Sequence, residues 1–214
     1  MANLIIKSSA DDLVLKGSGG NSAITVGSTG NTTLAGTANN LGTVTAGTIG
    51  TGVTFPSGHI LNTVQTVKTG VVSEVESTAA IDWSDITGMT CNITPASGNK
   101  VLVFYTANIG SRVGYMMSLR LMRGSTAIYI GDEVSGNPRA SSRVRGEDVN
   151  MWNANGMYLD ASAGGDGSTA ITYKLQWTGE SSNTMYLNRS YAHNAGSYYY
   201  GMTASHITLM EVKA

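Results

Sequence analysis

Cysteine, charge and long apolar runs are all scarce in this chain of 214 residues. The single cysteine, Cys91, has no second thiol to pair with, so a disulfide within the chain is excluded and a buried, small hydrophobic side chain is the default interpretation. No apolar run is long enough for a signal peptide or a membrane span. The sequence therefore predicts a protein made in the cytoplasm, without membrane insertion.

The charge balance excludes a second group of partners and ligands. Asp, Glu, Lys and Arg make up only 13% of the residues, and the formal net charge is -1. Such a chain offers no electrostatic footprint for nucleic acid or for an anionic membrane surface. Its three histidines lie far apart and there is one cysteine, so neither a zinc site nor a Cys/His nucleophile pair is predicted. We expect no metal and no cofactor.

Paired carboxylates are the remaining candidate for catalysis. Asp82 and Asp85 flank Trp83, but residues 83–85 are typical of a turn with solvated side chains. An acid and base pair needs a cleft and a set separation between the two carboxyl groups. Residues 17–21 resemble a phosphate-binding loop, yet no Lys-Ser/Thr pair follows them. We therefore expect the protein not to be an enzyme.

Residues 17–67 are built mainly from Gly, Thr, Ser, Asn and single aliphatic residues, and contain no Asp, Glu, Lys or Arg. Such a stretch has too few large apolar side chains to bury a core of its own. Short alternations between glycines, such as Ile24/Val26 and Val53/Phe55, favour extended backbone. We interpret the stretch as a fibrous shaft in which three parallel chains share their aliphatic side chains. A flexible Gly/Ser/Thr linker is the alternative.

Residues 1–16 precede this shaft and hold two short apolar runs. Leu4, Ile5 and Ile6 form the first run and residues 13–15 the second, which predicts two small strands around a turn. They are too short to fold without a partner surface. We interpret the segment as an attachment site, with Leu4, Ile5 and Ile6 as its contact residues and a frayed terminus as the alternative.

A turn at residues 55–59 separates the shaft from a C-terminal domain, because Pro56 fixes φ and Gly58 permits a reversal. The predicted domains are therefore 1–16, 17–59 and 60–214. Residues 171–177 alternate strictly between apolar and polar, which indicates a half-buried antiparallel strand. About ten such short strands predict an all-β fold, an antiparallel jelly-roll β-sandwich. The expected strands are 60–68, 71–77, 89–93, 100–107, 115–123, 127–131, 151–159, 169–178, 184–188 and 205–212.

The same alternation predicts which side chains fill the core of the sandwich. We expect methionines such as Met117 and Met157 to fill the core or an interface, and His206 to be packed on the last strand. The predicted core residues are Val101, Val103, Leu119, Leu121, Ile171, Tyr173, Leu175, Trp177, Ile207 and Leu209.

Five segments carry a resemblance to a known class of proteins. Residues 23–37 and 47–59 resemble the shaft of tail-fibre proteins from tailed bacteriophages. The C-terminal half is similar to the globular heads of such fibres at residues 86–95, 99–103 and 205–212. The resemblance covers residues 23–214 and includes no catalytic motif.

This resemblance implies a homotrimeric virion appendage whose head is a jelly roll of the tumour-necrosis-factor or C1q kind. The implied function is non-enzymatic: the head binds a glycan or protein on the host cell surface, while residues 1–16 dock on other virion proteins. A capsid head fibre or decoration protein with a purely structural role is the alternative, since such proteins share this kind of head.

Residues 190–201 are the best candidate for receptor contact, because the segment mixes Tyr with Ser, Gly and Asn as recognition loops do. The alternative is that Tyr198 and Tyr200 begin the next strand and pack inside, leaving Tyr199 outside. A second candidate loop is 152–156. The residues proposed to contact the receptor are His193, Asn194, Tyr198, Tyr199, Tyr200 and Trp152.

A mixed-charge run at residues 139–148 includes Arg139, Arg143, Arg145, Glu147 and Asp148. We interpret it as a loop with a solvated face, whose ion pairs contribute little individually. The sharper alternative places these charges at a subunit boundary or against an acidic glycan.

Overall fold

The computed structural model describes residues 13–16, 22–26, 32–34, 53–76 and 81–214. The chain forms two compact units, Met1–Val53 and Thr54–Ala214, and the predicted division after residue 59 falls inside the second. Every element in the described ranges is a strand, and every pairing between strands is antiparallel. Within these ranges there is no helix that could cross a membrane.

The described part of the first unit is a small sheet of three strands in the order β1-β2-β3. The register pairs Leu15 with Ile24 and Ile24 with Leu34, so aliphatic residues align across the sheet. These pairings lie within one chain, and the strand predicted at residues 13–15 is confirmed. The segment with Leu4, Ile5 and Ile6 lies outside the described residues. The strands are β1 (Leu13–Lys16), β2 (Ser22–Val26) and β3 (Thr32–Leu34).

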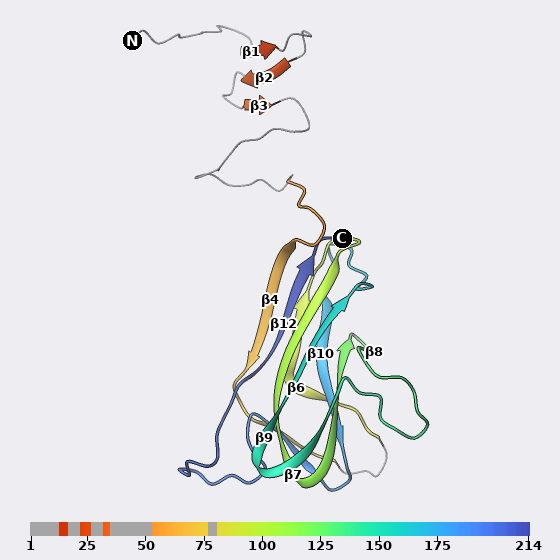
Figure 1. Ribbon diagram of the computed structural model, residues 1–214, viewed down its shortest axis with the longest axis vertical. Helices are drawn as coiled ribbons and strands as arrows, with labels where there is room; N and C mark the ends of the chain where they lie inside the picture. Colours follow the sequence, from red (N-terminus) through yellow and green to blue (C-terminus); the bar gives the residue numbers. More distant parts are fainter. Residues whose placement is uncertain (1–12, 17–21, 27–31, 35–52, 77–80) are drawn as a thin grey trace. The chain divides into compact units, whose positions relative to one another are not determined.

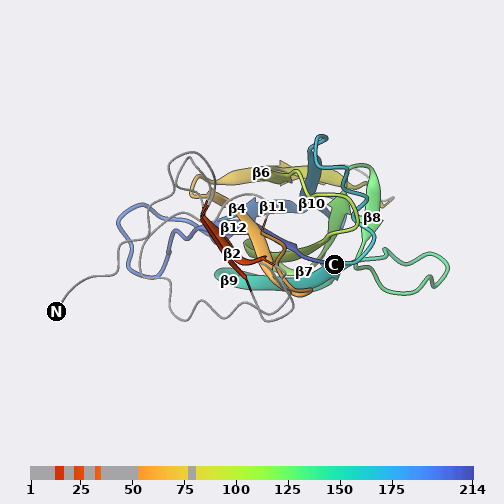
Figure 2. The same cartoon turned by 90° about the horizontal axis from the view of Figure 1, so that it is seen from above.

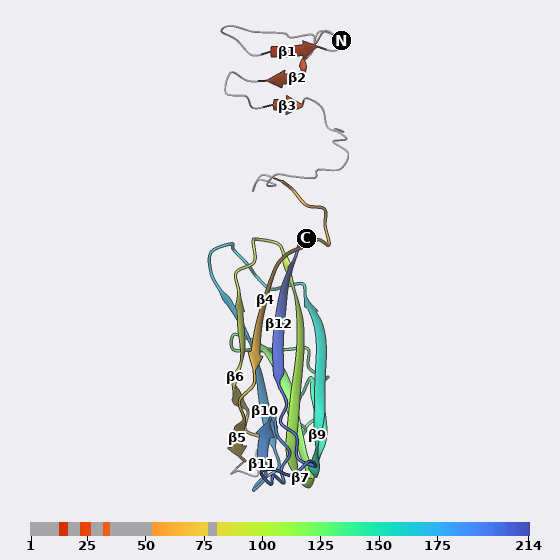
Figure 3. The ribbon, with the colours of Figure 1, turned by 90° about the vertical axis from the view of Figure 1, so that its left-hand side faces the viewer.

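The second unit is a β-sandwich whose strands run nearly parallel to its long axis (Figures 1 and 3). The main path of pairing is β4-β12-β7-β10-β6, and β9 pairs along β7. Short strands β5, β8 and β11 complete the sheet. The bounds are β4 (Ile60–Lys68), β5 (Val72–Val75), β6 (Ser84–Ile93), β7 (Lys100–Arg123), β8 (Thr126–Ile128), β9 (Ser142–Asp160), β10 (Ile171–Gly179), β11 (Thr184–Leu187) and β12 (Ser205–Val212).

Two long strands, β7 and β9, cross between the layers of the sandwich. The first part of β7 pairs with β12 and with the end of β9, while its last part pairs with β10 and with the start of β9. One layer is thus β4-β12-β7-β9 and the other β6-β10-β7-β9, which is a jelly-roll order. Seen from above, the layers form an almost closed ring (Figure 2).

The crossing depends on a bend in β7 between residues 110 and 114. The register with β9 is irregular here. A Cβ at Gly110 would lie 2.2 Å from the carbonyl oxygen of Arg189, and Gly114 has a φ of +86°. Glycine is therefore required at both positions, once for a close backbone approach and once for the left-handed backbone.

The core lies between the two layers, and nearly all of the residues predicted to be buried there are buried. Tyr173, Leu175 and Trp177 are fully buried, so the predicted faces of β10 are correct, although Ile171 is only partly buried at the edge. Cys91 is buried. Among the methionines Met117 is in the core, but Met157 is 61% exposed.

Three sequence interpretations need correction. The strands predicted at 100–107 and 115–123 are one continuous strand, β7. The mixed-charge run is not a loop beyond residue 141, because Arg143 and Arg145 lie on the first half of β9. Charged side chains fit there because they alternate with Val144 and the buried Gly146, and so project from the outer face. Finally, Ser84 and Asp85 begin β6 and are not part of a turn.

Candidate functional site

The loop between β11 and β12, residues 188–204, lies at one end of the sandwich and is called the tip loop below. The start of β4 and the C-terminus lie at the opposite end (Figures 1 and 3). There the backbone of Gly58 donates to Lys213, and Lys213 donates to His59. The second unit therefore has a connecting end, where the chain enters and leaves, and a free end that carries the tip loop.

Asn188 anchors the base of the tip loop. Its side-chain amide donates to the carbonyl oxygens of Lys68 (2.7 Å) and Gly70 (3.1 Å), and its Oδ1 accepts from the hydroxyl of Ser205 (2.6 Å). Its backbone N–H donates to Asn108. Asn188 is fully buried with a φ of +68°, a conformation that asparagine tolerates better than most residues. The base of the loop is thus tied to β4, β7 and β12.

Arg189 stiffens the next turn of the tip loop. Its guanidinium lies 4.1 Å from the centre of the Tyr186 ring and donates to the carbonyl oxygens of Ser190 and Tyr191. The hydroxyl of the buried Ser190 donates to Ala192. With two donors bonded to the backbone of the loop and its charge over an aromatic face, Arg189 is a structural residue of the loop.

The outer part of the tip loop presents aromatic rings to solvent. Tyr198 is 98% exposed and Tyr199 is 77% exposed, and their rings meet edge to face with centroids 6.1 Å apart. Tyr200 is half-buried. The alternative that Tyr198 begins the last strand is wrong, because β12 begins at Ser205.

His193 and Asn194 are also exposed, on the approach to the same turn. The carbonyl oxygen of Asn194 accepts from the backbone of Ser197, which closes the turn that displays the tyrosines. The structure therefore brings His193, Asn194, Tyr198 and Tyr199 into one exposed segment, as their closeness in sequence implies.

Trp152 lies on strand β9. The second candidate loop, predicted at residues 152–156, is therefore wrong, because these residues are part of that strand. It is 42% exposed and lines a shallow hollow with Arg145 and Glu147. The tip loop contacts β9 just before it, where Ala192 donates to the carbonyl oxygen of Asp148. Trp152 and the tip loop thus belong to the same end of the sandwich.

Asp85 takes part in a polar network on the outer face of β6 and β10. Its carboxylate accepts from Lys174 Nζ and Gln176 Nε2, each at 2.7 Å. Burial opposes ionisation, but these two hydrogen bonds and the Lys174 charge outweigh it and lower the pKa of Asp85. The carboxylate is an ion-pair partner on a strand. Within the described ranges, no group of three or more His, Cys, Asp or Glu side chains is placed to hold a metal ion.

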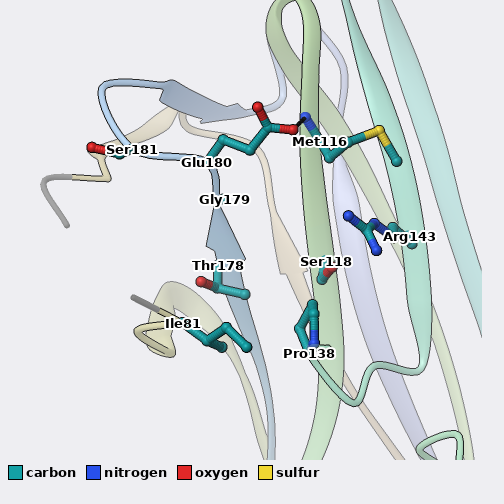
Figure 4. Close-up of a pocket in the computed structure, with 9 residues that line it drawn as sticks. All are labelled: Ile81, Met116, Ser118, Pro138, Arg143, Thr178, Gly179, Glu180 and Ser181. Carbon is teal, nitrogen blue, oxygen red and sulfur yellow. Dashed lines mark hydrogen bonds between the residues drawn. The ribbon is translucent and has the colours of Figure 1, made fainter. Parts of the chain in front are cut away.

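A recess of about 270 Å³ lies beside the end of β10. Figure 4 shows Glu180 reaching to Met116, whose backbone N–H donates to Oε1 at 3.0 Å, while Arg143 approaches from β9. Pro138 and Ile81 form its apolar walls. Glu180 is held by a backbone donor, so its carboxylate is a structural acceptor at the rim of a largely apolar recess.

Comparisons with known proteins add little. No family model matches the chain, and no curated protein matches it. A chain in the structure of infectious bursal disease virus Gx strain is similar over 89% of this chain, with 14% sequence identity and a TM-score of 0.34. This chain covers 46% of that chain, which is less than half of its length. A similarity at this level supports no inference about function, and the resemblance to phage tail fibres stays a prediction.

Proposed function

We propose that the protein is a bacteriophage tail-fibre or receptor-binding protein of the virion, without enzymatic activity, which attaches the virion to a glycan or protein on the host cell surface. Its head would be a homotrimer of the jelly-roll unit. Residues 1–16 would dock on other virion proteins through Leu4, Ile5 and Ile6.

The observation that carries this proposal is the placement of the tip loop. In the second unit, the chain enters at the connecting end, and exposed tyrosines stand on an anchored loop at the free end. A rigid scaffold that presents Tyr, His and Asn at its free end suits surface recognition. Three copies of a weak site on one stalk would gain avidity without any new contact.

The outer face of the β4-β12-β7-β9 layer supports the trimer. Beside residues 101–109 of β7, the outward-facing residues of β4, β12 and β9 carry no charged side chain. Val67 is 54% exposed and Met157 is 61% exposed on this face. Exposed apolar surface of this kind is typical of interfaces between proteins.

We expect the full-length protein to sediment as a trimer, because association would cover this face and pair the shaft segments. Analytical ultracentrifugation and light scattering measure the mass directly. A monodisperse monomer in which protease cuts freely between residues 17 and 59 would contradict the trimer and support the linker interpretation.

We expect the double substitution Tyr198→Ala and Tyr199→Ala to weaken binding of the protein to host cells by about tenfold or more, since exposed tyrosines dominate such contacts. Phe55→Ala is the matched control, because it removes an aromatic ring at the connecting end. Binding of labelled protein to cells measures the effect, and His193→Ala with Asn194→Ala tests the adjoining residues. Unchanged binding by a variant that keeps its assembly would contradict the tip loop as the site and favour the decoration role.

A further inference from the structure

The loop between β8 and β9, residues 129–141, projects from the side of the sandwich (Figures 1 and 2). The two arms of the loop are joined by a backbone hydrogen bond from Gly131 to Ala140, and Arg139 Nε donates to the carbonyl oxygen of Gly131 at 3.0 Å. The loop therefore has internal order of its own. Against the sandwich it leaves a hollow of about 810 Å³.

Tyr129 also lines a second hollow, of about 490 Å³. We call the two together the side groove. Both volumes fall within the range of small-molecule sites. The first hollow is lined by Ala127, Ile128, Tyr129, Ile130, Gly131, Arg139, Ala140, Ser141 and Tyr158, and the second by Phe104, Tyr105, Thr106, Tyr129, Asn155, Gly156, Met157 and His206.

An aromatic platform stands in the middle of the side groove. The rings of Tyr129 and Tyr158 are stacked, with centroids 5.3 Å apart and planes inclined by 28°. Tyr129 is 41% exposed and has a φ of +51°, which is unusual for a bulky residue and marks a position held by its surroundings. Strain of this kind is concentrated at binding sites.

The buried side chain of Tyr105 lies beside the platform. Its Oη is enclosed next to the Ser141 side chain. Burial, and then the neighbouring Tyr129, raise the pKa of Tyr105 to about 12 although the hydrogen bond with Ser141 opposes the shift, so the hydroxyl stays protonated. A Cβ at position 156 would lie 2.2 Å from this ring, so Gly156 is what allows the ring to reach the groove. The Tyr105 ring thus lines the second hollow beside the platform.

Polar groups surround the platform without a strong net charge. Arg139 lies in the first hollow, where its charge is shared with Glu133 at 4.0 Å. In the second hollow Asn155 accepts from the hydroxyl of Thr106 (2.8 Å) and leaves its amide N–H groups to donate elsewhere. A ligand with many phosphates would find a single, partly neutralised cation. A ring with an apolar face and hydroxyl groups at its rim matches this lining.

We propose that the side groove binds a neutral glycan, with one sugar ring stacked on Tyr129 and hydroxyl groups paired with Arg139 and Asn155. The two hollows, which share Tyr129 as a lining residue, accept consecutive sugar units. This site is separate from the tip loop, and it stands whether or not the tip loop binds the host.

The test uses the full-length protein and saturation-transfer NMR with neutral sugars, namely glucose, galactose, mannose, N-acetylglucosamine and their disaccharides. We expect transfer to at least one sugar, a loss of about tenfold or more in affinity for Tyr129→Ala, and near wild-type binding for Tyr129→Phe, which keeps the ring. Arg139→Ala should weaken binding less. Thermal unfolding of each variant checks that the sandwich is intact.

Tyr199→Ala separates this site from the tip loop. If Tyr199→Ala still binds sugar but no longer binds host cells, both sites are supported. If Tyr199→Ala still binds both sugar and host cells, the side groove is supported and the tip loop is contradicted as the host-binding site. The inference is overturned if no neutral sugar binds the wild-type protein, if folded Tyr129→Ala binds sugar as the wild type does, or if Tyr199→Ala abolishes sugar binding.

Discussion

Replacing Leu175 by alanine is expected to lower the free energy of unfolding by about 2–5 kcal/mol. Leu175 is fully buried on β10 and lies opposite Leu121 of β7 in the register. Trp177 and Tyr173, also fully buried, point to the same side. Removing the isobutyl group loses its burial and leaves a cavity that close-packed neighbours fill only in part.

Urea unfolding at a fixed protein concentration measures the effect of Leu175→Ala, since association would otherwise add to the apparent stability. Thr172→Ala is the matched control, because Thr172 lies on the other face of the same strand and should change stability by no more than about 0.5 kcal/mol. A change of that small size for Leu175→Ala itself would show that the core is not packed as described.

Replacing Asp160 by alanine should cost about 3–5 kcal/mol, the range for breaking a buried ion pair from one side. Asp160 is 2% exposed at the end of β9. Arg123 Nη1 lies 2.8 Å from both carboxylate oxygens, and Tyr173 Oη donates to Oδ2 at 2.8 Å. Without the carboxylate, a fully buried hydroxyl loses its acceptor, and the Arg123 guanidinium keeps, among the described residues, only the carbonyl oxygen of Ser162.

Burial, with Asp160 close by, raises the pKa of Tyr173 well above its usual range, so the hydroxyl stays a donor at every ordinary pH. Tyr173→Phe therefore tests the origin of the cost. Tyr173→Phe should lower the free energy of unfolding of the wild-type protein. It should lower that free energy clearly less in the Asp160→Ala background, where the Tyr173 hydroxyl has no acceptor. Equal costs in both backgrounds, measured by urea unfolding, would show that the two residues are not coupled.

Strands with one buried face were predictable because their side chains alternate with a period of two. The bounds of β4 and β12 agree with the prediction, and the residues expected in the core from β10 are buried, apart from Ile171 at the edge. β7 was predicted as two strands, 100–107 and 115–123, and the gap between them contains Gly110 and Gly114. In the folded chain these glycines bend one strand between two layers, and only the neighbouring strands show that the backbone continues.

The composition of residues 190–201 only weakly favoured an exposed segment over one in which Tyr198 packs inside, and the structure leaves Tyr198 and Tyr199 exposed. The anchor of the segment was not predictable. The Asn188 side chain donates hydrogen bonds to Lys68 and Gly70, which are distant in sequence. The residues next to Asn188 in the sequence give no sign that its side chain is buried and makes several hydrogen bonds. The side groove was missed for the same reason, since its platform joins Tyr129 of a loop to Tyr158 of β9.

By itself, the sequence determined the all-β class and the inward faces of the strands, because each depends on properties of neighbouring residues. Only the tertiary structure decided which strands pair, where β7 bends, and which polar groups meet. Asp160 and Arg123, or Tyr105 and Gly156, are each paired by contacts across the fold. Such contacts leave no local pattern, because burial and hydrogen bonding join residues at distances in sequence that periodicity does not reach.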